Sequence, residues 1–417
     1  MLMVAGPFDM TYKSCSGDHP ATVPLYGRSH SRSSLRARAG DTTQFGSVRL
    51  STLEDGAGRG TRILDFSTGS GLQFTINVDR AMDIGAFTHN GRAIGWQSAA
   101  GTRHPALNNN QEDSGYGWNR SFSGFLATCG LDHILGPEEV SASTYGHPAR
   151  TSVQQTQHGR IANTPARLTG YGEVWDGNAC TLWAEGVVKQ ATLFGDVLEL
   201  NRRITAKLGS NTVSITDKVT STGFLRTPHM LLYHVNLGYP LLDAQTRYLA
   251  PIQSVIYATH LAKGLESQRV GYRTCPDPIE GFSEQVWQHQ MGHDELGIVP
   301  VAVVNDHLDF GLLMETSASQ LPCAFQWQNF QAGHYVLAIE AATHHIKGDN
   351  FARERGEMIW MKPGETRSYH VQFTVLVDAA DISDSEEKIR SISRQPDTDY
   401  PAPSGRFPAL YQDQEEL

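Results

Sequence analysis

Alternation of apolar and polar positions is the dominant pattern along the chain. In the stretch 368–377 every second residue is apolar, namely Tyr369, Val371, Phe373, Val375 and Val377. This is the period-2 pattern of a strand with one buried face. The stretch 198–201 alternates in the same way, and the turn at 209–211 leads into a matching stretch from Val213, as expected for β-hairpins. Because no amphipathic helical pattern exceeds about three turns, the chain is predicted to be all-β, with a large, mainly antiparallel β-sandwich as its core.

The two ends of the chain lack this pattern. Residues 1–35 are rich in Ser, Arg and Gly, and we expect them to form a flexible leader. Residues 379–417 are acidic and polar with several prolines, which predicts a mostly disordered tail with at most one short helix near residues 385–393. The predicted domain therefore spans residues 36–378, without a linker or a detectable repeat inside it.

Composition narrows the classes of partner. The 417 residues include 34 Lys and Arg and 44 Asp and Glu, which gives a formal net charge of −10. An acidic chain is repelled by the phosphates of nucleic acid and by anionic lipid surfaces, and its most basic segment, 28–38, lies mainly in the expected leader. No stretch approaches the ~20 apolar residues of a transmembrane helix. We therefore expect neither nucleic acid nor a membrane as a partner.

The cysteines indicate a reducing compartment. Their odd number, their wide spacing and the absence of a CxxC pair argue against a disulfide framework or a zinc ribbon: they are Cys15, Cys129, Cys180, Cys275 and Cys323. The first residues also lack the basic and then apolar pattern of a signal peptide. A cytoplasmic location is the expectation.

Familiar cofactor and nucleophile motifs are missing from the sequence. The stretch 68–71 (TGSG) lacks the third glycine and the following helix of a dinucleotide site, and neither a P-loop nor a GxSxG elbow is present. His289 and His293 are four residues apart, but a glycine lies between them and HExxH is absent. Cys129 and His133 share one short segment, which gives no reason for catalytic geometry. We predict no metal and no cofactor.

Three segments place an ionisable group in an apolar β context. His158 lies in 157–160 (QHGR), His234 interrupts the apolar run 231–240, and Glu340 ends the apolar run 335–340. A lone carboxylate in such a run is costly unless it is paired or faces a polar cleft. Any one of these residues could be structural, but the three together favour a functional site.

These segments are part of a wider resemblance to the aldose 1-epimerase (galactose mutarotase) superfamily, in a branch of mutarotase-like proteins of unknown substrate. The resemblance extends over about residues 39–378 and also includes the stretches 39–44 (AGDTTQ), 80–85 (RAMDIG), 124–131 (GFLATCGL) and 364–369 (GETRSY). It implies a β-supersandwich that binds a small-molecule carbohydrate in a cleft across one sheet.

The resemblance also implies the roles of individual residues. His234 would be the general acid, Glu340 the general base, and His158 a second histidine that binds and polarises the sugar. The other residues expected to bind substrate are Trp327 as a stacking platform, Arg120 and Arg160 for hydroxyl or anionic groups, Asp83 and Asn236. The implied protein is an isomerase that interconverts sugar anomers.

A carboxylate and an imidazolium suit the opening of a cyclic hemiacetal. The carboxylate takes the proton of the anomeric hydroxyl while the imidazolium gives a proton to the ring oxygen. Each positioned group contributes about 10²–10⁴-fold to the rate, and no metal or cofactor is required. We therefore expect Glu340 to be ionised and His234 to be charged in the free protein, with a bell-shaped pH–rate profile.

Two other functions fit the same residues. The acid/base pair could drive epimerisation, elimination or cyclisation of a different small molecule, since the usual Asn-His-Ser/Thr-Tyr-Phe context of the histidine is absent. The cleft could also belong to a non-catalytic sugar-binding module, although binding alone needs no matched acid and base.

Overall fold

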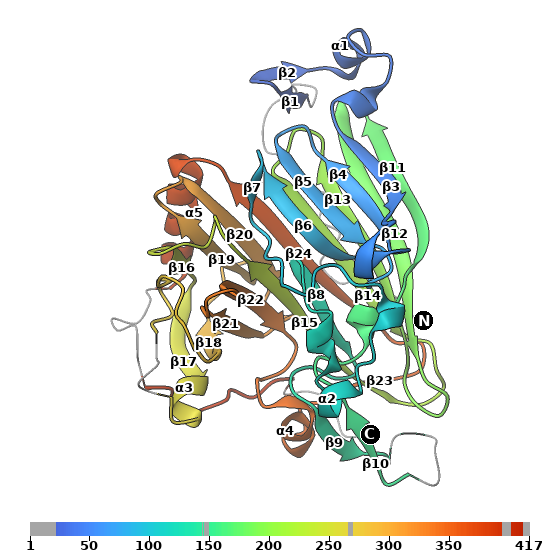
Figure 1. The fold of residues 1–417 in the computed structure, drawn as a ribbon, viewed down its shortest axis with the longest axis vertical. Helices are drawn as coiled ribbons and strands as arrows, with labels where there is room; N and C mark the ends of the chain where they lie inside the picture. The colour runs from blue at the N-terminus through green and yellow to red at the C-terminus, as the bar shows by residue number, and fades with distance from the viewer. Residues whose placement is uncertain (1–21, 144, 146–149, 266–269, 394–401, 412–417) are drawn as a thin grey trace.

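The computed structural model describes residues 22–143, 145, 150–265, 270–393 and 402–411. Within them the paired strands form antiparallel sheets, as the alternating pattern predicts (Figure 1). In the expected strand around residue 371, Tyr369, Val371, Phe373 and Val375 are buried. The protein has a mainly antiparallel β-sandwich fold.

Two large sheets form the sandwich. The eight-stranded sheet has the order β11 (Arg167–Asp176), β12 (Ala179–Ala191), β13 (Val197–Lys207), β14 (Thr212–Ser221), β24 (Thr366–Leu376), β20 (Phe310–Ser317), β19 (Ile298–Asn305) and β16 (Arg247–Leu249). The seven-stranded sheet has the order β17 (Ile252–Ala258), β18 (Gln285–Met291), β21 (Cys323–Asn329), β22 (Val336–Ala342), β15 (Thr227–Leu237) and β23 (Ile359–Met361), with β8 (Leu126–Leu131) also paired to β15.

Smaller elements complete the described chain. A five-stranded sheet has the order β3 (Ser47–Thr52), β4 (Arg62–Ser67), β5 (Leu72–Asn77), β6 (Asp83–His89) and β7 (Arg92–Ala93). Two hairpins pair β1 (Val23–Leu25) with β2 (Arg28–His30) and β9 (Glu138–Ser141) with β10 (Ser152–Gln155). The α-helices are α1 (Arg32–Arg36), α2 (Glu112–Gly115), α3 (Thr259–Ala262), α4 (Gly348–Glu354) and α5 (Ala379–Ile392). The short 3-10 helices are η1 (Thr42–Gln44), η2 (Gly56–Gly58), η3 (Pro105–Leu107), η4 (Gly117–Arg120) and η5 (Ile161–Asn163).

Strand β15 contributes to two separate apolar clusters. Successive side chains of a strand point to opposite faces of its sheet. Tyr233 and Val235 belong to the large core, which also contains Phe373 from the eight-stranded sheet. Leu232 belongs to a second cluster, which is rich in tryptophan and phenylalanine. His234 therefore lies on the face of β15 that carries this aromatic cluster.

A fully buried arginine joins elements of the three largest sheets. Arg202 on β13 donates to Asp217 on β14, at 2.7 Å from Nη2 to Oδ2, and to Asp83 on β6, at 2.8 Å from Nη1 to Oδ1. Nη2 of Arg202 also donates to the hydroxyl of Thr128 on β8 at 2.8 Å. The hydroxyl of Tyr233 on β15 donates to Asp217 at 2.7 Å. Buried charges are tolerated when they are paired and hydrogen-bonded in this way.

Each of the two expected end segments contains some residues with defined structure. Most of the expected leader, residues 1–21, lies outside the described residues, but β1, β2 and α1 follow it, and Leu35 is buried. Helix α5 begins at Ala379, six residues before the expected helix, because Asp378 caps it by accepting from two backbone N–H groups. In the tail, Leu410 is buried and Tyr411 donates to the carbonyl of Thr343 at 2.7 Å. The division into leader, domain and tail stays a prediction.

Across the parts of the chain that the structure describes, no helix combines the length and the apolar character needed to cross a bilayer.

Replacing Arg202 tests the buried network. Arg202→Met keeps the length of the side chain but leaves Asp83 and Asp217 buried without their cation, so we expect a loss of about 3–5 kcal/mol in the free energy of unfolding, or failure to fold. The matched control is the adjacent Arg203→Met, because Arg203 pairs with Glu185 where both side chains are 42–43% exposed. That change should cost about 1 kcal/mol or less. Chemical denaturation of both variants checks this, and equal losses would contradict the role of Arg202.

Candidate active site

His234 and Glu340 face each other across two neighbouring strands. They are direct partners in the antiparallel register of β15 and β22, and directly opposed residues lie on the same face of a sheet. Nε2 of His234 is 3.5 Å from Oε1 of Glu340, and the two side chains are only 5% and 4% exposed. The fold thus brings together two residues that are 106 positions apart (340 − 234).

Asn236 fixes the orientation and tautomer of His234. Its side-chain amide donates to the carbonyl oxygens of Gly124, at 3.0 Å, and of His234, at 3.2 Å. The amide oxygen is therefore the atom that lies 2.6 Å from Nδ1 of His234, so Nδ1 must carry the proton and donate it. In the neutral imidazole this leaves the lone pair of Nε2 facing Glu340. The structure places Asn236 as a partner of the histidine.

Burial decides where the proton of this pair lies. Loss of water lowers the pKa of His234 to about 3, although its hydrogen bond with Asn236 acts in the opposite direction. Loss of water also raises the pKa of Glu340 to about 8, and the negative charge of Glu284 adds to this rise. Between these values the carboxyl is protonated and the imidazole is neutral. The expectation of a charged pair in the free protein is therefore wrong, because both charged forms lose their hydration in this position.

His158 is the third ionisable residue of the candidate active site, beside His234 and Glu340. Its imidazole lies 5.7 Å from that of His234, centroid to centroid, with the rings nearly perpendicular. Nδ1 accepts from the backbone N–H of Leu135 at 3.3 Å, so the neutral ring carries its proton on Nε2. Burial holds the pKa of His158 well below its usual range. The three residues implied by the resemblance are thus brought together by the fold.

The backbone around His158 is unusual. His158 has a φ of +56°, a left-handed conformation that is uncommon for a residue with a side chain and often marks a functional position. The next residue has to be glycine, because a Cβ on Gly159 would lie 2.2 Å from the carbonyl oxygen of Gly130. This close approach explains the His-Gly pair in the sequence.

Aromatic side chains surround His234. The rings of Phe122, Trp327 and Trp118 lie 4.9, 5.4 and 5.9 Å from the imidazole, centroid to centroid. Trp327, the expected stacking platform, meets His234 edge-on, and its indole N–H donates to Glu284 at 2.8 Å. From the sequence, Trp118 is expected in the core or at the rim of the site, and Phe122 is not singled out. Their segment has neither strand nor helix periodicity, and the only signal is a concentration of aromatic residues among glycines and serines.

Two other expected substrate-binding residues have protein partners. Arg120 is half exposed and is engaged by the carboxylates of Asp113, at 2.8 Å, and Glu112, at 2.9 Å. Asp83 belongs to the buried network of Arg202 and accepts from Thr128 and Arg202. Neither side chain contacts His234 or Glu340 through a described hydrogen bond or ion pair.

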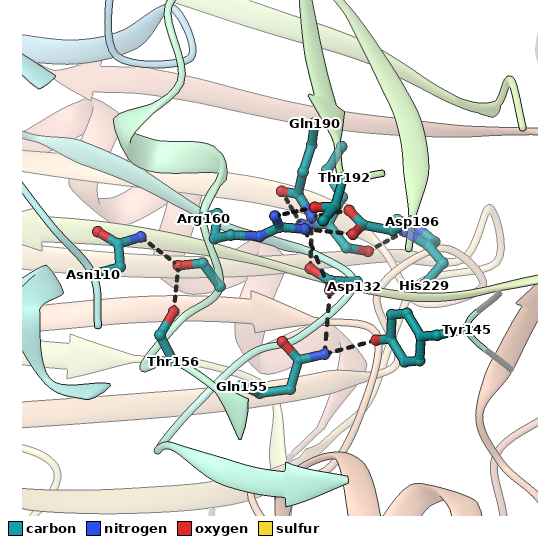
Figure 2. Close-up of polar contacts among 12 residues, drawn as sticks. Asn110, Asp132, Tyr145, Gln155, Thr156, Arg160, Gln190, Thr192, Asp196 and His229 are labelled. Carbon is teal, nitrogen blue, oxygen red and sulfur yellow. Dashed lines mark hydrogen bonds and ion pairs between the residues drawn. The ribbon is translucent and has the colours of Figure 1, made fainter. Parts of the chain in front are cut away.

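Arg160 belongs to a separate polar cluster. Figure 2 shows its guanidinium beside Asp196, at 2.5 Å, and the hydroxyl of Thr192, at 2.5 Å, with Asp132 at 3.9 Å. The amide of Gln190 donates to both aspartates, at 2.6 Å to Asp132 and 2.9 Å to Asp196. Arg160, Asp132, Asp196 and Thr192 line a cavity of about 410 Å³. Arg160 reaches its partners only in the folded chain, so its short sequence context could not reveal them.

No three His, Cys, Asp or Glu side chains in the described part of the chain are grouped as metal ligands.

Comparison with known families and structures assigns the chain to a family. It belongs to the family described as "Domain of unknown function (DUF4432)", whose model matches residues 58–375. No curated protein matches the chain.

Solved structures show that the chain has a galactose mutarotase-like fold. A protein from Klebsiella pneumoniae, provisionally described as an aldose 1-epimerase, is 26% identical with a TM-score of 0.75, and the match covers 84% of this chain and 88% of that one. A galactose mutarotase-like protein from Clostridium acetobutylicum is 13% identical with a TM-score of 0.50, and the match covers 79% of this chain and 98% of that one. The second similarity concerns the fold alone.

Proposed function

We propose that the protein is an enzyme that interconverts the two anomers of a free aldose. The observation that supports this most strongly is the buried His234–Glu340 pair, which holds a single transferable proton. Ring opening requires one group that takes a proton and one that gives a proton. The structural similarity to the Klebsiella protein supports the same reaction class.

The pair can supply both groups without any net change in charge. A protonated carboxyl beside a neutral imidazole contains as many protons as a carboxylate beside an imidazolium, so the two forms differ only in the position of one proton. Hydrogen bonds to a carboxylate favour its ionised form. Hydroxyl groups of a bound sugar would donate such bonds to Glu340 and shift the proton to His234.

Ring opening then follows from these positions. Glu340 takes the proton of the anomeric hydroxyl, His234 donates its Nε2 proton to the ring oxygen, the bond from C1 to the ring oxygen breaks, and a carbonyl forms at C1. After the carbonyl rotates, the same two transfers run in reverse and close the ring on its other face. Asn236 keeps Nε2 directed at the reacting atoms through its bond with Nδ1.

The surroundings of the pair support binding roles for three further residues. Trp327 and Phe122 offer aromatic faces and edges for a sugar, as is common in carbohydrate sites. His158 presents an Nε2–H group as a donor to a sugar oxygen. We leave Arg120, Arg160 and Asp83 out of the proposed site because other side chains occupy their polar groups.

Anomer exchange measured by proton NMR on a panel of aldoses tests the reaction. The wild-type protein should accelerate exchange of at least one aldose, and Glu340→Gln should lower that rate by about 10²–10⁴-fold, because it removes the group that takes the proton. Glu54→Gln, which changes an exposed carboxylate in a loop, should keep the wild-type rate. Binding of an aldose without any exchange would instead favour a sugar-binding module or a different proton-transfer reaction.

The pH dependence of kcat/KM tests the protonation of the pair. Above about pH 8 Glu340 loses its proton and the pair has none to give, while below about pH 3 His234 gains a proton and the pair has no base. The rate should therefore be level from about pH 4 to about pH 7 and should decline above about pH 8. A decline centred near the ordinary histidine pKa of about 6.5 would show that His234 titrates alone and would contradict the pairing.

A further inference from the structure

The indole N–H of Trp118 lacks a hydrogen-bond partner within the described residues. The side chain is only 2% exposed, and a buried tryptophan usually satisfies its N–H. Two other buried tryptophans of the chain follow that rule. The indole N–H of Trp96 donates to the carbonyl of His334 at 2.6 Å, and that of Trp287 donates to the side-chain oxygen of Gln328 at 3.2 Å.

Trp118 lies against the candidate catalytic residues. Its ring centroid is 4.5 Å from that of His158, 5.9 Å from that of His234 and 4.2 Å from that of Phe122. An unpaired buried donor costs about 1–3 kcal/mol, so a native protein tends to keep one only where it has a use. Its place beside both histidines suggests that a ligand supplies the missing acceptor.

A second buried polar group without a hydrogen-bond partner lies in the segment that carries His158. The side-chain oxygen of Gln157, the residue before His158, is buried without a hydrogen-bond partner. The backbone N–H of Gln157 donates to the carbonyl of Gly115 at 2.9 Å, which ties this segment to the one that carries Trp118. One unpaired acceptor and one unpaired donor therefore lie in segments that border the same histidines. A ligand with several hydroxyl groups satisfies both kinds, because each hydroxyl donates and accepts.

We propose that Trp118 is a substrate-binding residue whose indole N–H donates to an oxygen atom of the bound aldose. This inference rests on the proposed function, since it takes the sugar as the occupant of the site. The hydrogen bond forms only when ligand is present, so the free protein retains an unpaired donor and the complex does not. Trp118 thus contributes to affinity and orientation, while the proton transfers remain with His234 and Glu340.

Substitution of Trp118 by phenylalanine tests the proposal. Trp118→Phe keeps an aromatic ring but removes the N–H. In the Glu340→Gln background, which holds the sugar without turnover, the Kd for the aldose that the wild-type protein exchanges should rise about 10-fold. The matched control is Trp287→Phe, which removes a satisfied N–H in the core between the two large sheets. The control should lower the melting temperature more than Trp118→Phe does, and it should leave the Kd within about 3-fold of the parent value.

The indole region of a ¹⁵N–¹H NMR spectrum gives a readout that does not require turnover. The signal that disappears in Trp118→Phe identifies this residue, and it should move downfield when aldose is added, while the signal of Trp287 stays in place. Turnover without movement of this signal, or an unchanged Kd in Trp118→Phe, would overturn the role of Trp118 and leave the proposed function standing. Movement of the signal without turnover would support the role of Trp118 and reject the isomerase. If no aldose moves the signal and none is exchanged, both proposals are wrong.

Discussion

The buried ion pair network around Arg202 determines which way strand β15 faces. Arg202 holds Asp83, Asp217 and Thr128, and Asp217 in turn accepts from the hydroxyl of Tyr233. Because Tyr233 is fixed toward this network, strand alternation places His234 on the opposite face. A shift of the register by one residue would exchange these two side chains. The position of the candidate catalytic histidine therefore depends on charges that lie beneath it in the core.

On the face of β15 that carries His234, desolvation rather than ion pairing determines the protonation of the side chains. Phe122, Trp118 and Trp327 surround His234, and both His234 and Glu340 are buried, so neither side chain favours its charged form. What remains is a neutral pair with one proton that can move between two positions. Such a pair can give and take protons near neutral pH without a buried net charge, and this property links the apolar surroundings to the proposed reaction.

Periodicity was sufficient to predict the fold class, and ionisable residues in apolar runs drew attention to His234 and Glu340, whereas His158 lies in a turn. The alternation around Val371 predicts its strand, and His234 and Glu340 stand out because an ionisable group in such a run is costly. The ion-pair partners that side chains find in distant parts of the chain could not be predicted from the sequence. Arg120 and Arg160 carry the same charge in any context, and only the folded chain shows the carboxylates that engage them. The protonation of the His234–Glu340 pair depends in part on burial by Trp118 and Phe122. Their segment has no strand or helix periodicity, so this effect could not be inferred from the strands alone.

The most direct test is ¹⁵N NMR of the His234 imidazole in the free protein at about pH 6. There the ordinary histidine pKa of about 6.5 would leave the ring mostly charged, whereas its pKa in this site is about 3. The account predicts a neutral ring with a proton on Nδ1, held by Asn236, and an unprotonated Nε2 that faces Glu340. A spectrum with both nitrogens protonated would contradict it.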